Sequence, residues 1–257
     1  MKQGDFSELA QAYRHRTGYS LRVLKSLAAY VGAWREDFQV ADIGAGTGKL
    51  TENLLELGFR IHAVEPNQAM RSEGISQVNH SHVIWSEGSA EMTGLPDNYA
   101  DWILMASSFH WTDYPKTLAE FSRILKPGGY FTALWNPRNL EANELHQRIE
   151  AKIYEIAPEI QRVSSGSSRF TEDLDAKLLS TGHFTDLIFM QAPHEVQMTP
   201  ERYLGAWRSV NDIQAQAGPE RFKLILAAIE KEIEHLDEVI VPYQTRAWTV
   251  RSRKKCA

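Results

Sequence analysis

The chain has 257 residues, of which 43% are hydrophobic and 24% charged, with a formal net charge of −5. This composition excludes a disordered chain, fits one large globular domain, and argues against a nucleic-acid partner. The single cysteine, Cys256, excludes an intrachain disulfide. No apolar run reaches the roughly 18 residues that cross a bilayer, so we expect a cytoplasmic protein with no membrane association.

The first half of the chain alternates short apolar runs with helical patterns. Apolar residues between Leu21 and Val31 follow helical spacing and predict an N-terminal helical layer. Five predicted strands follow: FQVADIG (38–44), RIHAVEP (60–66), HVIWSEGSAE (82–91), ADWILMAS (100–107) and YFTALWN (130–136). Because each parallel strand needs a crossover helix to return, this alternation predicts a doubly wound, mostly parallel α/β sheet.

The rhythm changes after residue 136. We expect a helix over about 140–160, a flexible loop over 164–168 and another helix that ends near Gly182. A sixth strand should cover about 184–190, followed by two helices over 200–236. The run QTRAWTV (244–250) then predicts a seventh strand that closes the sheet.

The stretch VADIGAGTGKL (40–50) places three glycines after the first strand, where open α/β sheets bind their ligands. The spacing G-x-G-x-G differs from the G-x-G-x-x-G of dinucleotide sites. The preceding Asp42 suits an ammonium group better than a pyrophosphate. Glu65, at the end of the second strand, can accept hydrogen bonds from both hydroxyls of a ribose. The ligand is therefore either a dinucleotide or a nucleoside that carries an amino acid.

Five motifs in order favour the second ligand: VADIGAGTGKLT (40–51), VEPNQAM (64–70), EGSAEMTGLP (87–96), SSFHW (107–111) and LKPGGYF (125–131). This set resembles class I S-adenosylmethionine-dependent methyltransferases, in the small-molecule branch called methyltransferase type 11, which includes relatives of the trans-aconitate methyltransferases. The resemblance covers about residues 6–136. It implies a Rossmann-like, seven-stranded, mostly parallel sheet with an antiparallel last strand.

The resemblance also implies the cofactor-binding residues. Gly44, Ala45 and Gly46 would contact the methionine part, with Asp42 beneath it, and Glu65 would hold the ribose. Four further residues would border the adenine: Pro66, Asn67, Ser89 and Ala90. Ser107 would lie near the methionine carboxylate or sulfonium. Tyr13 and Tyr19 would cover the cofactor from the N-terminal segment. Many relatives carry Asp at the position of Ser89, which can accept from the adenine amino group with a full charge.

We expect the acceptor to lie against the FHW turn, at Phe109, His110 and Trp111, and against Trp135. Aromatic rings suit a sulfonium because they attract a cation without competing as nucleophiles. His110 and Trp111 are the candidate catalytic residues. His110 is either a general base for a hydroxyl or a hydrogen-bonding group that orients the acceptor. A carboxylate acceptor needs no base, and Arg138, Arg169 or Arg208 could then bind its charge.

The predicted protein is one methyltransferase domain over 1–257. An N-terminal helical lid covers 1–35, and a cofactor-binding core covers 36–136. Two helical insertions, 137–183 and 196–240, form an acceptor cap. The last strands lie in 184–195 and 241–257. The expected activity moves a methyl group from S-adenosylmethionine to a hydroxyl or carboxylate oxygen of a small molecule, leaving S-adenosylhomocysteine, with no metal. The alternatives are an RNA or protein methyltransferase and a non-catalytic S-adenosylmethionine-binding protein. The acceptor and the oligomeric state stay open.

Overall fold

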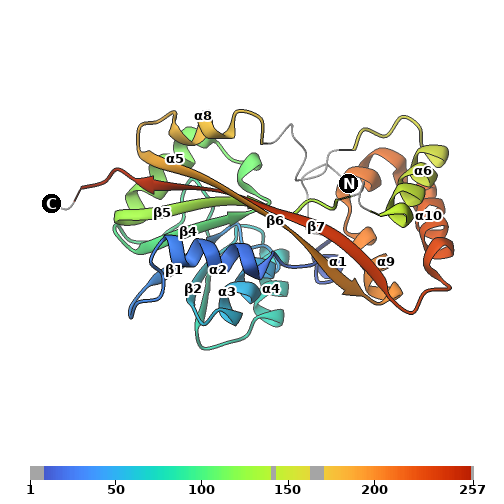
Figure 1. Ribbon diagram of the computed structural model, residues 1–257, viewed down its shortest axis with the longest axis horizontal. Helices are drawn as coiled ribbons and strands as arrows, with labels where there is room; N and C mark the ends of the chain where they lie inside the picture. Colours follow the sequence, from blue (N-terminus) through green and yellow to red (C-terminus); the bar gives the residue numbers. More distant parts are fainter. Residues whose placement is uncertain (1–8, 140–142, 163–170, 256–257) are drawn as a thin grey trace.

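A computed structural model of the protein describes residues 9–139, 143–162 and 171–255. Its centre is a seven-stranded sheet in the order β3-β2-β1-β4-β5-β7-β6 (Figure 1). The strands are β1 (Gln39–Ile43), β2 (Arg60–Val64), β3 (Val83–Ser86), β4 (Ala100–Ala106), β5 (Leu125–Trp135), β6 (Phe184–Met198) and β7 (Val239–Ser252). Pairing is parallel from β3 to β5, and β7 runs antiparallel to both of its neighbours. The predicted sheet with an antiparallel last strand is confirmed.

Helices cover both faces of the sheet, as the alternating pattern requires. The helices of this part are α2 (Leu21–Tyr30), α3 (Lys49–Glu56), α4 (Gln68–Gln77), α5 (Tyr114–Ile124) and α8 (Leu174–Leu179). On one face, α5 and α8 bury Leu118, Phe121 and Leu178 in a shared core. On the other face, α2 and α3 bury Leu24 and Leu54 against β1 and β4. Both cores meet the sheet, so its central strands are rigid supports for the loops at their ends.

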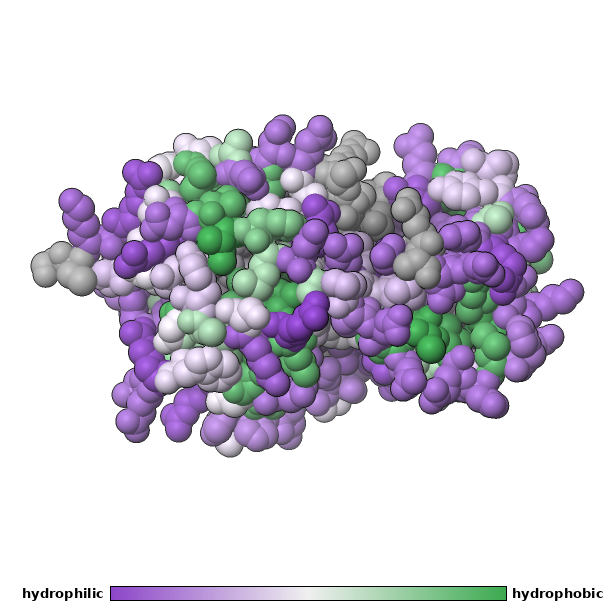
Figure 2. Space-filling view, viewed as in Figure 1, coloured by the Kyte–Doolittle hydropathy of each residue, from purple (hydrophilic) through white to green (hydrophobic). Residues whose placement is uncertain are grey.

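The remaining helices form a separate cap beside the sheet (Figure 1). They are α6 (Glu144–Ile156), α9 (Pro200–Arg208) and α10 (Asn211–Ile233), and a short helix α1 (Ala10–Tyr13) contacts α9. The cap has its own apolar core, with Ile153, Trp207 and Ile229 buried in it. Helix α10 is kinked at Gly218 (φ +73°), directly before Pro219. The two parts appear as two lobes of the surface in Figure 2.

Strands β6 and β7 link the two lobes and are longer than the sequence predicts. We expected a sixth strand of 184–190, but the two strands pair continuously in register from Ile188↔Thr249 to Met198↔Val239. Beyond the edge of the sheet, the backbone N–H and C=O groups of each strand pair with those of the other. The ladder therefore continues past the residues where the apolar pattern ends. The pair projects as a long arm that carries α9 and α10 (Figure 1).

Other differences lie at the ends of elements. The N-terminal helical layer is two helices, because residues 17–20 have no regular secondary structure. Helix α2 begins at Leu21 after the N-cap Ser20, whose hydroxyl accepts from the amide of Val23. The loop predicted over 164–168 lies outside the described residues.

Among the helices of the described chain, none combines the length and apolar character that crossing a bilayer requires.

Candidate active site

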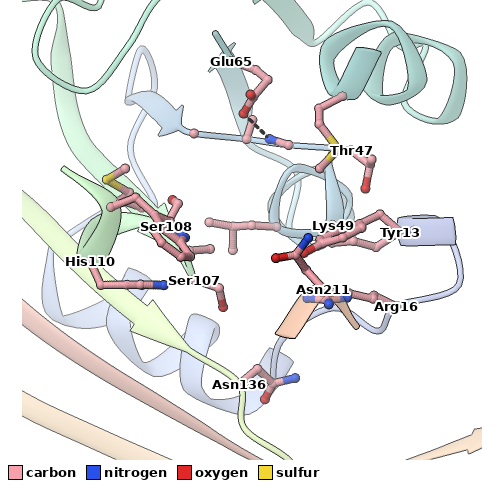
Figure 3. A pocket seen from close by; sticks show the side chains of 18 of the residues that line it. Tyr13, Arg16, Thr47, Lys49, Glu65, Ser107, Ser108, His110, Asn136 and Asn211 are labelled. Atoms are coloured by element: carbon pink, nitrogen blue, oxygen red, sulfur yellow. Dashed lines mark hydrogen bonds between the residues drawn. The ribbon is translucent and has the colours of Figure 1, made fainter. Parts of the chain in front are cut away.

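One large cavity, of about 760 Å³, lies at the carboxyl ends of the parallel strands, between the sheet and the cap (Figure 3). We call its two parts the sheet end and the cap end. The sheet end is lined from the loops after β1 to β4: Asp42, Gly44, Ala45, Gly46, Glu65, Pro66, Asn67, Ser89, Ala90, Ser107 and Ser108. The cap end is lined from the N-terminal segment, the chain after β5, the cap helices and β7: Arg16, Asn136, Arg138, Glu150, Arg162, Asn211, Asp212 and Tyr243.

The glycine turn opens the sheet end to a ligand. Gly44 (φ +67°) and Gly46 (φ +58°) have left-handed backbones, which glycine adopts at little cost. A Cβ on Gly44 would come within 2.8 Å of the Ser108 hydroxyl. The Ser108 hydroxyl is buried and has no hydrogen-bond partner among the described residues. A side chain at position 44 would therefore fill the narrow space beside this unpartnered hydroxyl.

Glu65 is fixed across the turn by two backbone amides. Its Oε2 accepts from the amide of Gly46 at 2.8 Å, and its Oε1 accepts from the amide of Asn67 at 2.9 Å. Burial raises the pKa of Glu65, and these two hydrogen bonds oppose the rise. Each oxygen keeps a second lone pair, so the carboxylate can accept two more hydrogen bonds from a ligand.

Asp42 lies beneath the turn at the end of β1 and is fully buried. Its Oδ2 accepts from the Thr51 hydroxyl at 2.6 Å, whereas its Oδ1 has no hydrogen-bond partner within the described chain. Burial is the main cause that raises the pKa of Asp42 to about 7. A cationic ligand group that reaches Oδ1 would stabilise the charged carboxylate.

Two predicted tyrosines connect the N-terminal segment to the cavity. The Tyr19 hydroxyl lies 3.0 Å from the Ser107 hydroxyl, and burial raises the pKa of Tyr19 to about 12, so its hydroxyl stays protonated. Tyr13 lines the cavity with the Arg16 guanidinium 3.9 Å from its ring centroid. Arg16 donates from Nε to the Ser209 hydroxyl at 2.8 Å. The segment thus bridges β4 and the cap, as a covering element should.

Two side chains of the FHW turn line the cavity, and the third is buried in the core. His110 and Trp111 line the cavity, and Trp111 is half exposed. Phe109 does not line it: the side chain is fully buried and packs on Phe131, with ring centroids 5.2 Å apart. The expectation that Phe109 contacts the acceptor is corrected, because a one-turn 3-10 helix over Phe109–Trp111 (η2) directs its first side chain into the sheet.

Trp135 also lies outside the cavity lining, which corrects its predicted contact with the acceptor. It is fully buried at the end of β5, and its Nε1 donates to His110 Nδ1 at 3.3 Å. The indole nitrogen can only donate, so His110 Nδ1 must accept and the proton of the neutral ring must be on Nε2. Burial lowers the pKa of His110 to about 4. The imidazole, which points into the cavity in Figure 3, is therefore a neutral hydrogen-bond donor and a poor general base.

The cap end brings together charged residues that no local motif marks. Arg162 donates from Nη1 to both oxygens of Glu150, at 2.5 and 2.6 Å, and from Nε to Asp212 at 3.2 Å. Arg138, a candidate from the sequence, is part of this lining, whereas Arg208 is not and Arg169 lies outside the described residues. These residues come from three distant segments, so only the fold reveals the cluster.

Comparison with known proteins agrees with this geometry. The profile of the methyltransferase domain family called methyltransferase type 11 matches residues 41–133, from β1 to β5. The chain is built on a class I S-adenosylmethionine-dependent methyltransferase domain. This methyltransferase domain contains the glycine turn, Glu65, Ser89 and the FHW turn, but the match ends before the cap.

Relatives of the methyltransferase domain extend the comparison. An uncharacterised methyltransferase of Mycobacterium tuberculosis is 38% identical over 101 residues, which are 39% of this chain and 41% of the relative. The chain thus spans about two fifths of that relative. A structure assigned as a type II methyltransferase from Anaeromyxobacter dehalogenans superposes with a TM-score of 0.63 at 20% identity, over 92% of this chain and 97% of that one.

A second solved structure with a similar fold was determined with ligands bound. Phosphoethanolamine N-methyltransferase 2 of Haemonchus contortus, in complex with phosphomonomethylethanolamine and S-adenosylhomocysteine, superposes with a TM-score of 0.55 at 14% identity. The match covers 98% of this chain and 59% of that one. Across the described residues of our chain, no group of three metal-ligating side chains is present.

Proposed function

We propose that the protein transfers a methyl group from S-adenosylmethionine to a small molecule. The observation that carries this proposal is one continuous cavity, which runs from the glycine turn of the methyltransferase domain to a charged end formed by the cap. One end fits a cofactor and the other end leaves room for an acceptor beside it. The cap encloses the acceptor end, and this favours a small molecule over a protein or RNA.

The residues at the sheet end fit the cofactor. Glu65 has lone pairs for two ribose hydroxyls, and the unpartnered Oδ1 of Asp42 suits the ammonium of the methionine part. The unpartnered Ser108 hydroxyl can donate to its carboxylate. Pro66, Asn67, Ser89 and Ala90 line the part of the cavity that we assign to the adenine. When bound, the cofactor supplies an electrophilic methyl group on a sulfonium.

For a carboxylate acceptor, which is already ionised, the residues around the junction of the two ends need only align it and keep water out. A hydroxyl acceptor must also release its proton to water as the new C–O bond forms. Methyl transfer is an in-line displacement whose thioether leaving group needs no proton. His110 can donate from Nε2 to an acceptor oxygen and thereby hold it in line. Trp111 and Tyr19 supply aromatic surface next to the sulfonium position, and the N-terminal segment covers the cavity. The proposed acceptor atom is a hydroxyl or carboxylate oxygen.

The test is calorimetry with S-adenosylhomocysteine and with NAD, followed by methyl-transfer assays with isotope-labelled S-adenosylmethionine. We expect S-adenosylhomocysteine to bind and NAD not to bind, because the turn lacks the pyrophosphate spacing. Labelled methyl should pass to compounds in a small-metabolite extract and not to RNA or protein. NAD binding without S-adenosylhomocysteine binding contradicts the proposal, and label in RNA or protein contradicts the small-molecule acceptor.

A further inference from the structure

Arg138 lies at the cap end, next to aromatic side chains. It follows β5 by three residues and forms an isolated backbone bridge with Tyr243 of β7. Its guanidinium carbon lies 4.3 Å from the ring centroid of Trp207 and 5.8 Å from that of Tyr203. Burial opposes the charge of Arg138, but the neighbouring Tyr243 and Tyr203 raise its pKa. Because a guanidinium stacked on an aromatic ring loses little further freedom on binding, this arginine is ready to bind a ligand.

The neighbouring arginines are already neutralised or hydrogen-bonded. Arg162 forms ion pairs with Glu150 and Asp212, and Arg16 donates to the Ser209 hydroxyl and to its carbonyl. Within the described residues, no carboxylate lies within 4.0 Å of the Arg138 guanidinium to form an ion pair. Glu150 acts on Arg138 through longer-range attraction. An enclosed arginine without a direct ion pair is costly, and residues that bind charged substrates accept this cost.

The charge of the cap end specifies the kind of anion. Three arginines and two carboxylates of the cap end leave a formal charge of +1, and the nearby Lys49 is paired with Glu52 at 2.9 Å. That surplus matches a single carboxylate. A phosphate dianion would carry a second negative charge close to Glu150 and Asp212, and this repulsion disfavours it. The planar fork of an arginine also matches a carboxylate in a bidentate pair.

Building on the proposed function, we infer that the methyl acceptor carries a carboxylate that binds Arg138 at the cap end. This carboxylate is a recognition group. It holds the acceptor by the end that faces Trp207 and Tyr243, and so places the rest of the molecule toward His110 and the sheet end. Arg138 is in this view the residue that selects the substrate, and it takes no part in the displacement itself.

The experiment measures anion binding to protein saturated with S-adenosylhomocysteine. The probes are malonate, succinate and glutarate, each compared with its neutral diamide, and inorganic phosphate as a separate arm. We expect at least one dicarboxylate to bind with a measurable heat by calorimetry, its diamide not to bind, and phosphate to bind more weakly. Arg138→Met should weaken dicarboxylate binding by about tenfold to hundredfold. Arg138→Lys should retain part of it, because the charge remains without the fork.

The matched control is Arg148→Met. Arg148 is a more exposed arginine of the same cap, paired with Glu232 at 3.1 Å, and its loss should leave dicarboxylate binding unchanged. Thermal unfolding of each variant confirms that it is folded. Equal binding of diamides, tighter binding of phosphate, no dicarboxylate binding by the wild type, or no effect of Arg138→Met would each overturn the inference.

Two further measurements separate this inference from the proposed function. If Arg138→Met weakens S-adenosylhomocysteine binding as much as dicarboxylate binding, Arg138 serves the cofactor and the inference fails while the proposed function stands. If the wild type binds no S-adenosylhomocysteine, the proposed function fails. Dicarboxylate binding to the ligand-free protein, measured in the same way, then still reports on the Arg138 site alone.

Discussion

The sheet end and the cap end of the cavity are built in opposite ways. At the sheet end, Asp42 lies at the end of β1, and the glycines and Glu65 lie in the short loops that lead from β1 to α3 and from β2 to α4. At the cap end, Arg138, Glu150, Arg162 and Asp212 come from segments up to 74 positions apart. The family match of 41–133 covers the first and stops before the second.

This difference indicates which part of the cavity can vary without disturbing the other part. Loops at the ends of central parallel strands are held by the most buried part of the fold, so their geometry changes little when other segments change. Helices added beyond the sheet pack on their own core and can vary without disturbing those loops. A cofactor common to many acceptors fits the first location, and a particular acceptor fits the second.

The largest expected effect is at Glu65. Glu65→Ala removes two charge-assisted hydrogen bonds to the ribose and leaves the amides of Gly46 and Asn67 without their acceptor. We expect S-adenosylhomocysteine to bind about a hundredfold more weakly by calorimetry. Glu73→Ala, on the exposed side of α4, should leave the affinity unchanged. An unaltered affinity in Glu65→Ala would remove this residue from the cofactor site.

His110 lies where the two ends meet and should affect turnover without affecting the cofactor. If its Nε2 donates to the acceptor, His110→Ala should lower turnover by about tenfold to hundredfold and leave S-adenosylhomocysteine affinity intact. Because the pKa of His110 is lowered to about 4, nitrogen NMR should show a neutral ring, protonated at Nε2, from pH 8 down to pH 5. A ring that titrates near pH 6.5, together with a pH-dependent rate lost in the variant, would indicate a general base instead.

Asp42 should make cofactor binding pH-dependent. With its pKa raised to about 7, the carboxyl is neutral below that pH and charged above it. The ammonium of the cofactor prefers the charged form, so affinity for S-adenosylhomocysteine should fall by up to about tenfold per pH unit below pH 7. Asp42→Asn should give weaker binding that is flat from pH 6 to 8, whereas the surface variant Asp97→Asn should keep the wild-type slope. A flat wild-type profile contradicts the pairing.

His146 tests whether the cap can be altered independently of the sheet end. Burial lowers its pKa to about 4, so between pH 6.5 and 4 the unfolded chain binds a proton that the folded chain does not. Stability must fall as pH decreases through this window. His146→Leu should therefore reduce the loss of unfolding free energy between pH 7.5 and 5.5 by about 1 kcal/mol in urea titrations.

The control for this prediction is His235→Leu, at an exposed position after α10, which should keep the wild-type loss of stability. Affinity for S-adenosylhomocysteine should be the same in both variants and in the wild type. A change of affinity in His146→Leu would show that the cap and the sheet end are coupled. An unchanged acid sensitivity would show that His146 does not govern it.

The sequence predicted the sheet side well because its signals are local. The central strands are short segments rich in apolar residues, and the glycine turn and Glu65 directly follow two of them. Phe109 and Trp135 were misplaced because their facing depends on one turn of 3-10 helix and on the register of β5, neither of which a pattern of residue types specifies. The partnership of Arg162 with Glu150 and Asp212 depends on how the cap helices pack, which only the tertiary structure provides.

The arm formed by β6 and β7 has a consequence for how such proteins diversify. Its strands pair without interruption from Ile188↔Thr249 to Met198↔Val239, and α9 and α10 are inserted at its tip. A segment spliced in at that tip shifts no residue of the ladder, and the register on the sheet is preserved however long the new segment is. The tip of the arm is thus a position at which one helical module can replace another without moving the sheet end, where we propose that the methyl donor binds.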